Sequence, residues 1–200
     1  MFTTLVFDLS GVVMSNGLTK ASAEIAALLR ADQAMVFALF KGPFSYAYRE
    51  GGMDSAIFWA NLAALLKTDK IDAMRQLFFD AYDLMPDTLA MMAKYREQGL
   101  CIGYLSNGPL DRAAYHRQKF KLDDFFDFGA YSSELGAIKP NHEIFTRFLE
   151  RFSLSADQII FIDDQLPFVE KAQSYGIRSI QFADVAQVKL AIDNYLKLSA

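Results

Sequence analysis

Residues 159–164 read Ile-Ile-Phe-Ile-Asp-Asp, an apolar run that ends in two adjacent carboxylates. Two other apolar runs end in the same abrupt way: residues 5–7 before Asp8, and residues 101–105 before Ser106 and Asn107. Short apolar runs bounded by polar residues are typical of buried strands. Ligands of open α/β sheets bind outside the carboxyl ends of the strands, so we expect these polar side chains to meet in one crevice.

The segments around these runs predict the fold. A helix is expected to begin at Pro86 and Asp87 and to stop before Gly99, and further helices are expected at 111–120, 141–152, 167–176 and from about Asp184. A strand is expected at 178–182, whereas 125–140 look irregular. Because strands alternate with helices, the sequence predicts an α/β protein with a Rossmann-like parallel sheet.

Residues 18–85 differ from the rest because they contain helical patterns and no convincing strand. Asp32 and Asp54 stand where they can cap two of the helices. We therefore predict a core domain of residues 1–14 and 87–200 that carries an inserted all-helical domain of residues 15–86.

The insert is rich in aromatic residues, and these either form its core or line an apolar pocket, the core being favoured; they are Phe37, Phe40, Phe44, Tyr46, Tyr48, Phe58 and Trp59. Arg49 lies beside this cluster. It is either a solvated side chain or one placed to meet an anion of the substrate.

Composition limits the possible partners. The net charge of −4, from 20 basic and 24 acidic residues, predicts no nucleic-acid partner and no membrane partner. Charged residues interrupt every apolar stretch, and the first ten residues lack the basic and apolar regions of a secretory signal, so a cytoplasmic protein is expected. Cys101, the only cysteine, is expected to be buried in its strand. Nothing in the sequence indicates the oligomeric state.

Asp8, Ser106 and Asn107 have chemical roles open to them. A carboxylate after the first strand can accept a phosphoryl group, because it forms a mixed anhydride that water later cleaves. A hydroxyl and an amide after a second strand can hold phosphoryl oxygens. Each is also explained alone by a hydrogen-bonded turn, so the two interpretations stay open at each position.

Lys139 and the pair Asp163 and Asp164 add charge to this picture. A lysine ammonium can offset negative charge on a nucleophile and a phosphate, although a lone lysine is usually solvated. Two adjacent carboxylates at the end of a buried strand repel each other, and a nearby cation relieves that repulsion. Mg²⁺ takes oxygen ligands and commonly uses one or two carboxylates with a substrate phosphate, so a magnesium site is predicted here.

Together these segments resemble the four motifs of the haloacid dehalogenase-like hydrolase superfamily, in the same order. They read FDLSGVV at 7–13, LSNG at 105–108, GAIKP at 136–140 and IIFIDD at 159–164, so the resemblance spans the chain. It is closest to a branch that contains sugar-phosphate phosphatases. The predicted helical insert stands where this family carries a helical cap that covers the site and selects the substrate.

The resemblance implies specific roles. Asp8 would be the nucleophile and a Mg²⁺ ligand, Ser106 and Asn107 would bind the phosphoryl group, and Lys139 would stabilise it. Asp164 would reach the metal with support from Asp163, and the backbone carbonyl of Ser10 would be a further metal ligand. The expected activity is that of a Mg²⁺-dependent phosphatase of a small phosphorylated metabolite, acting through an aspartyl-phosphate.

Two positions depart from the family pattern. Ser10 stands where phosphatases of this family usually have an aspartate that acts as general acid and base, so slow turnover and a preference for good leaving groups are expected. Phe168 stands where an Asp or Asn often supports the metal, so weak Mg²⁺ binding is expected. Ser10 and LSNG also suit a 2-haloacid dehalogenase, against which Val12 and the paired aspartates count. Ser10 and Phe168 together suit a third possibility, a catalytically impaired member that binds a ligand or a partner.

Overall fold

The computed structural model describes residues 2–197 and contains a five-stranded, fully parallel sheet with the strand order β3-β2-β1-β4-β5. The strands are β1 (Thr4–Phe7), β2 (Cys101–Ser106), β3 (Phe128–Tyr131), β4 (Ile159–Asp163) and β5 (Arg178–Gln181). Strand β1 lies at the centre, between β2 and β4. The polar residues that follow β1, β2 and β4 therefore lie side by side at one edge of the sheet.

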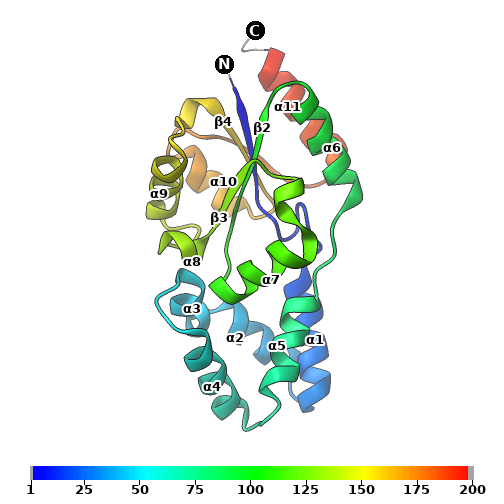
Figure 1. The fold of residues 1–200 in the computed structure, drawn as a ribbon, viewed down its shortest axis with the longest axis vertical. Coiled ribbons are helices and arrows are strands. Elements are labelled where there is room, and N and C mark those ends of the chain that lie inside the picture. Colours follow the sequence, from blue (N-terminus) through cyan, green and yellow to red (C-terminus); the bar gives the residue numbers. More distant parts are fainter. Residues whose placement is uncertain (1, 198–200) are drawn as a thin grey trace.

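Helices cover both faces of the sheet (Figure 1). Leu5 and Phe7 of β1 contact one core, which includes residues of α6 (Pro86–Glu97), α7 (Leu110–Phe120) and α11 (Val185–Lys197). Val6 contacts the other core, formed with α8 (Ser132–Leu135), α9 (His142–Phe152) and α10 (Leu166–Gln173). Alternate residues of one strand thus face opposite helical layers, which is why each run in the sequence is apolar throughout. The predicted α/β Rossmann-like core is confirmed.

Between β1 and β2 the chain forms helices and two isolated bridges, Ser10 with Met14 and Met14 with Leu84, and there is no strand among residues 17–80. The helices are α1 (Gly17–Leu29), α2 (Gln33–Lys41), α3 (Tyr46–Glu50), α4 (Ser55–Leu66) and α5 (Ile71–Asp80), with a 3-10 turn at Pro43–Ser45. Asp32 and Asp54 accept hydrogen bonds from the backbone N–H groups of Met35 and Ala56, both at 2.7 Å, as predicted for helix caps. In Figure 1 these helices lie beyond the carboxyl ends of the strands.

Two features differ from the sequence expectations. Residues 128–131, predicted to be irregular, form the edge strand β3, in which Gly129 makes room for the ring of Tyr104. Cys101, predicted to be buried, is exposed, because it is the first residue of β2 and precedes the buried part of that strand.

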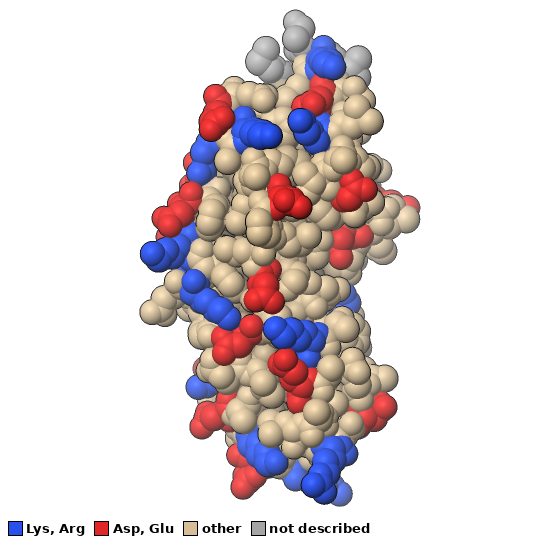
Figure 2. Space-filling view, turned by 90° about the vertical axis from the view of Figure 1, so that its right-hand side faces the viewer, with Lys and Arg blue, Asp and Glu red and all other residues tan. Residues whose placement is uncertain are grey.

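Two short 3-10 turns, Leu122–Asp124 and Ala156–Gln158, complete the described chain. Within residues 2–197 no helix has the length and apolar character needed to cross a membrane. Figure 2 shows basic and acidic side chains interspersed over one face of the molecule.

Candidate active site

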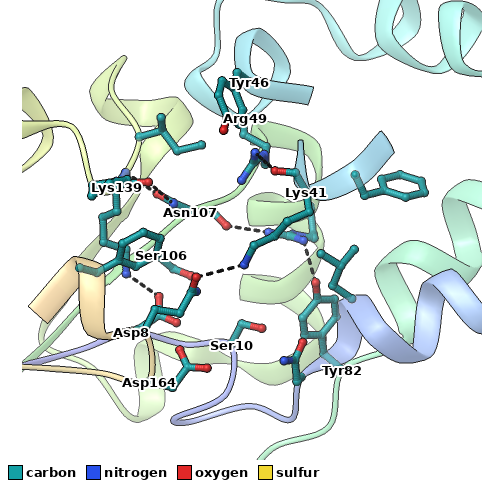
Figure 3. A pocket seen from close by; sticks show the side chains of 18 of the residues that line it. Asp8, Ser10, Lys41, Tyr46, Arg49, Tyr82, Ser106, Asn107, Lys139 and Asp164 are labelled. Carbon is teal, nitrogen blue, oxygen red and sulfur yellow. Dashed lines mark hydrogen bonds and ion pairs between the residues drawn. The ribbon is translucent and has the colours of Figure 1, made fainter. Parts of the chain in front are cut away.

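Asp8 occupies the end of the central strand and is almost fully buried. Its backbone N–H donates a hydrogen bond to the carbonyl of Ile162 in β4 at 2.8 Å, so the sheet itself fixes its position. One carboxylate oxygen, Oδ1, accepts a hydrogen bond from Lys139 Nζ at 2.8 Å. The other oxygen accepts no hydrogen bond from residues 2–197, and Asp8 lines a pocket at the strand ends (Figure 3). The carboxylate is therefore held on one side and open on the other.

Lys139 contacts residues at the carboxyl ends of β1, β2 and β4. Its ammonium donates to Asp8 Oδ1, to Asp163 Oδ2 at 2.6 Å and to the carbonyl of Leu105 at 2.9 Å, which uses all three of its protons. Burial alone would lower the pKa of Lys139, but the carboxylates of Asp163 and Asp8 outweigh burial and raise that pKa. The side chain is fully buried, which excludes the solvated position open to it in the sequence.

Asn107 holds the segment that carries Lys139. Its side-chain Nδ2 donates to the carbonyl of Lys139 at 3.0 Å, and the backbone N–H of Lys139 donates to Asn107 Oδ1 at 2.9 Å. The Lys139–Pro140 peptide bond is cis. The side-chain amide of Asn107 is thus engaged by the backbone of Lys139, while Ser106, at the end of β2, faces the pocket beside Asp8.

Asp163 and Asp164 differ sharply in surroundings. Asp163 is fully buried, and its two oxygens accept hydrogen bonds from Lys139 and from the backbone N–H of Gln165 at 2.9 Å. Burial raises the pKa of Asp163, and so does the nearby Asp8, whereas Lys139 opposes both. Asp164 lines the pocket, and its Oδ1 is buried without a hydrogen-bond partner within residues 2–197.

The three carboxylates fit a divalent cation. Asp8, Asp163 and Asp164 each offer an oxygen, and these oxygens lie within 4.8 Å of one another. One lysine faces them, so the cluster has an excess of negative charge in a place with little water. Burial and the charge of Asp8 raise the pKa of Asp164, as expected where a carboxylate lacks a cation. An all-oxygen donor set with an orphaned carboxylate oxygen suits Mg²⁺.

Gly11 lets Asp164 approach the loop after β1. Its φ of +87° is in the left-handed region, and a Cβ at this position would lie 2.6 Å from Asp164 Oδ2. Ser10 lines the pocket in the same loop. Phe168 also lines the pocket, with its ring centroid 5.2 Å from Lys139 Nζ, so an apolar ring lies close to the lysine.

The pocket has a volume of about 410 Å³ and lies between the strand ends and the helices α1–α5. Six of the seven predicted site residues line it, and these are Asp8, Ser10, Ser106, Asn107, Lys139 and Asp164; the seventh, Asp163, is fully buried and is not in the lining. Three cationic side chains line it as well, Lys41, Arg49 and Arg112. The sequence leaves two interpretations of Arg49 open, a solvated side chain or one that meets an anion of the substrate, and the structure places it in the pocket. Lys41 and Arg112 belong to no sequence motif, and only the fold brings them to the pocket.

Comparison with known proteins agrees with this arrangement. A family model described as haloacid dehalogenase-like hydrolase matches residues 2–170. Among curated proteins, the chain is 30% identical over 104 residues to a sesquiterpene phosphatase from Aspergillus oryzae, covering 50% of this chain and 53% of that protein. It is 24% identical over 99 residues to a glyceraldehyde 3-phosphate phosphatase from Pyrococcus abyssi, covering 49% and 42%. The matches thus span about half the length of these curated relatives.

Solved structures share the fold. A haloacid dehalogenase family enzyme from Bacteroides thetaiotaomicron, in complex with magnesium and inorganic phosphate, superposes with a TM-score of 0.74 at 19% identity, covering 94% of this chain and 99% of that one. An L-2-haloacid dehalogenase from Xanthobacter autotrophicus superposes with a TM-score of 0.71 at 18% identity, covering 96% and 81%. With the family model matching most of its length, the chain belongs to the haloacid dehalogenase-like hydrolases.

Proposed function

We propose that this protein is a Mg²⁺-dependent phosphatase that acts on a small phosphorylated metabolite through a phosphoryl group carried on Asp8. The observation that supports this most strongly is the different surroundings of the two Asp8 carboxylate oxygens. Lys139 holds one oxygen at 2.8 Å, and the other oxygen faces the pocket. The two curated relatives named above are phosphatases, and the Bacteroides enzyme was solved with magnesium and phosphate.

In the proposed reaction the free oxygen of Asp8 attacks phosphorus, the bond from phosphorus to the leaving oxygen breaks, and that oxygen takes a proton from water. Water then attacks the phosphoryl-Asp8, releasing phosphate and restoring the carboxylate. Lys139 keeps Asp8 oriented and offsets charge on the phosphoryl oxygens. Ser106 lies beside Asp8 and can donate its hydroxyl to the same oxygens. Bound Mg²⁺, held by Asp8, Asp164 and the carbonyl of Ser10, would neutralise negative charge at this end of the pocket.

Ser10 shapes the range of substrates. No carboxylic acid stands at this position to protonate the leaving oxygen, and general acid catalysis is typically worth about 10²–10⁴ in rate. We therefore expect acyl or anomeric phosphates to be hydrolysed faster than ordinary alkyl phosphates. The helices α1–α5 are proposed to form a cap, residues 15–86, over a core of residues 1–14 and 87–200. A cytoplasmic location and an absence of nucleic-acid and membrane partners remain predictions.

The test is steady-state hydrolysis of an acyl phosphate and an alkyl phosphate by the purified chain. Asp8→Asn, which keeps the shape of the side chain, should abolish release of phosphate, and EDTA should do the same reversibly. Asp157→Asn, at an exposed position outside the pocket, is the matched control and should retain activity. Activity that survives Asp8→Asn would rule out the covalent route.

Metal affinity can be measured separately. Phe168 offers no hydrogen bond to the metal ligands, so we expect weak Mg²⁺ binding by isothermal titration. Binding in the micromolar range would contradict this expectation.

A second candidate, a 2-haloacid dehalogenase, is favoured by Ser10 and by the fold shared with the Xanthobacter enzyme. In that reaction Asp8 attacks carbon and displaces halide, without a metal. Halide release from 2-chloropropionate that is unaffected by EDTA would favour this candidate. A third candidate, a catalytically impaired member, would lead if no phosphate ester or acyl phosphate were hydrolysed while Ser10→Asp gained activity.

A further inference from the structure

Three cationic side chains from three different helices line the pocket. Lys41 ends α2, Arg49 lies in α3, and Arg112 lies in α7. Figure 3 shows Arg49 away from Asp8 and Asp164, whereas the side chain of Lys41 extends toward the strand ends. None of the three forms an ion pair with a carboxylate of residues 2–197.

Neutral groups hold these cations in place. Lys41 Nζ donates to Gln165 Oε1 at 3.0 Å, and Arg49 donates to the carbonyl of Lys41 at 2.7 Å. Arg112 donates to the hydroxyl of Tyr82 and to the carbonyl of Asn107, both at 2.8 Å. The side chains are therefore oriented by neutral partners, and none of them has a carboxylate as a direct partner among residues 2–197.

Burying a guanidinium group without a carboxylate partner costs free energy. The chain accepts this cost at Arg112 and avoids it at Arg117. Arg112 is only 7% exposed, and its Nε is buried without a hydrogen-bond partner among residues 2–197. Burial, followed by repulsion from Arg112, lowers the pKa of Arg49 to about 10. On the same helix as Arg112, Arg117 forms a bidentate pair with Glu134, with both contacts at 2.7 Å. Arg112 is a buried cation without a carboxylate partner and Arg49 is a half-buried one, which implies an anionic ligand, because an uncompensated buried charge is strongly unfavourable.

The three cations also differ in the charged groups that surround them. Asp164 and Asp8 partly offset the charge of Lys41, which places this lysine beside the phosphoryl end of the pocket. Besides burial, the pKa of Arg49 is lowered by Arg112 and raised by Tyr46, Glu50 and Tyr82, and neither Asp8 nor Asp164 is among the groups that shift it most. Once a divalent cation balances the carboxylates, Lys41 and Lys139 can serve the transferred phosphoryl group. The two arginines are then left for a different anion.

We propose that Arg49 and Arg112 form a second anion-binding subsite, which takes a carboxylate or a second phosphate of the substrate at the end of the pocket away from Asp8. This proposal rests on the proposed phosphatase function and specifies its substrate class: small metabolites with two anionic groups. Guanidinium groups suit either anion because their paired N–H groups match two oxygens. Aromatic rings of Phe40, Phe78 and Tyr82 line the same pocket and would contact a short carbon spacer.

The test uses non-hydrolysable probes, so that it does not depend on turnover. Isothermal titration in Mg²⁺ compares propylphosphonate with propane-1,3-bisphosphonate and with 3-phosphonopropanoate, on the unmodified chain, on Arg49→Gln and on Arg49→Lys. Arg75→Gln, which changes an arginine of α5 outside the pocket, is the matched control. We expect at least one two-anion probe to bind about 10- to 100-fold more tightly than propylphosphonate. Arg49→Gln should remove most of that advantage, Arg49→Lys only part of it, and Arg75→Gln none.

Three outcomes would overturn the subsite. These are equal affinity for all probes, an advantage that survives Arg49→Gln, and an equal loss for all probes in Arg49→Gln, which would mean that the arginine serves the transferred group. The preferred two-anion probe indicates whether a carboxylate or a phosphate is bound. If the chain hydrolyses no phosphate ester but the Arg49-dependent advantage is present, the phosphatase proposal fails and the subsite stands. If alkyl phosphates are hydrolysed but the Arg49-dependent advantage is absent, the phosphatase proposal stands and the subsite fails.

Discussion

At the scale of single residues, Lys139 connects the parts of the candidate site. One ammonium forms ion pairs with two carboxylates at the ends of different strands, and all of these side chains are buried. Its neighbours in the sequence, GAIKP, indicate a constrained loop, but neither its burial nor its partners can be read from the chain. Arg112 is similar, because its role depends on α7 packing against the pocket and not on any local pattern.

Replacing Lys139 with Met should destabilise the protein. The change leaves Asp8 and Asp163 buried without their cation, and breaking a buried ion pair in this way typically costs about 3–5 kcal/mol. Urea denaturation without metal measures the effect, with Lys94→Met on the exposed face of α6 as control. A loss no larger than in the control would mean that the buried carboxylates do not depend on this lysine.

His116 should make stability depend on pH. It is buried in α7, and burial, with repulsion from Arg112, lowers its pKa to about 3. In the unfolded chain the pKa of this histidine is near 6.5. Between about pH 3 and pH 6.5 the imidazole is therefore protonated in the unfolded chain and neutral in the folded chain. The contribution to stability is therefore complete above pH 6.5 and declines as the pH falls toward 3, by about 2 kcal/mol between pH 7 and pH 5.

Chemical denaturation from pH 7 to pH 5 measures this effect. His116→Gln should flatten the decline, whereas His142→Gln, at an exposed position in α9, should keep it. Equal slopes in His116→Gln and the unmodified chain would contradict the assignment.

At the scale of elements, four of the five strands and their end residues were predictable from the sequence. The edge strand β3 and the exposure of Cys101 were not. Continuous apolar runs predicted β1, β2 and β4 because both faces of the sheet are covered by helices, whereas β5, which reads Arg-Ser-Ile-Gln, was predicted without such a run. Strand β3 was missed because Gly129, which accommodates Tyr104, resembles a break in the sequence. Likewise, Cys101 belongs to an apolar run, but only the register of β2 places it at the exposed end of the strand.

The loop after β1 should depend on Gly11 for two separable reasons. Gly11→Ala requires a left-handed backbone with a side chain, which costs about 1–2 kcal/mol, and pushes a methyl group against Asp164. Gly176→Ala has the same backbone requirement, with φ of +77° and no atom within 4 Å of the added Cβ.

Both variants should lose similar stability in urea. Only Gly11→Ala should weaken Mg²⁺ binding, by roughly 10–100-fold, because the displaced carboxylate is a proposed ligand. Equal Mg²⁺ affinity in the two variants would argue against a metal-binding role for Asp164.

At the scale of the whole molecule, contacts between α1–α5 and the sheet-bearing part determine the shape of the pocket (Figure 1). Tyr48 of α3 donates its hydroxyl to Asp111 of α7, 2.7 Å from Oδ1, and Ser55 donates to the same carboxylate. Ser132 donates to the carbonyl of Arg49 at 2.6 Å. The helical character of residues 18–85 was predictable from their periodicity. These contacts were not, because they join residues far apart in the chain.

Tyr48→Phe should loosen this junction while leaving the strand ends intact. The buried hydroxyl bonds a carboxylate, so we expect a loss of about 1.5–3 kcal/mol in stability and a raised KM with a smaller change in kcat. Tyr175→Phe is a suitable control, because no hydrogen bond to its hydroxyl from residues 2–197 is present. An unchanged KM would mean that the junction does not influence substrate binding.

The central claim, that Asp8 carries the phosphoryl group, is tested most directly by acid quench during turnover. The protein is mixed with an acyl phosphate and Mg²⁺, quenched within the first turnover, and digested for peptide mass spectrometry. We predict one phosphoryl group on Asp8 in the unmodified chain and none in Asp8→Asn. Release of phosphate at the normal rate with Asp8 unmodified at every quench time would contradict the account.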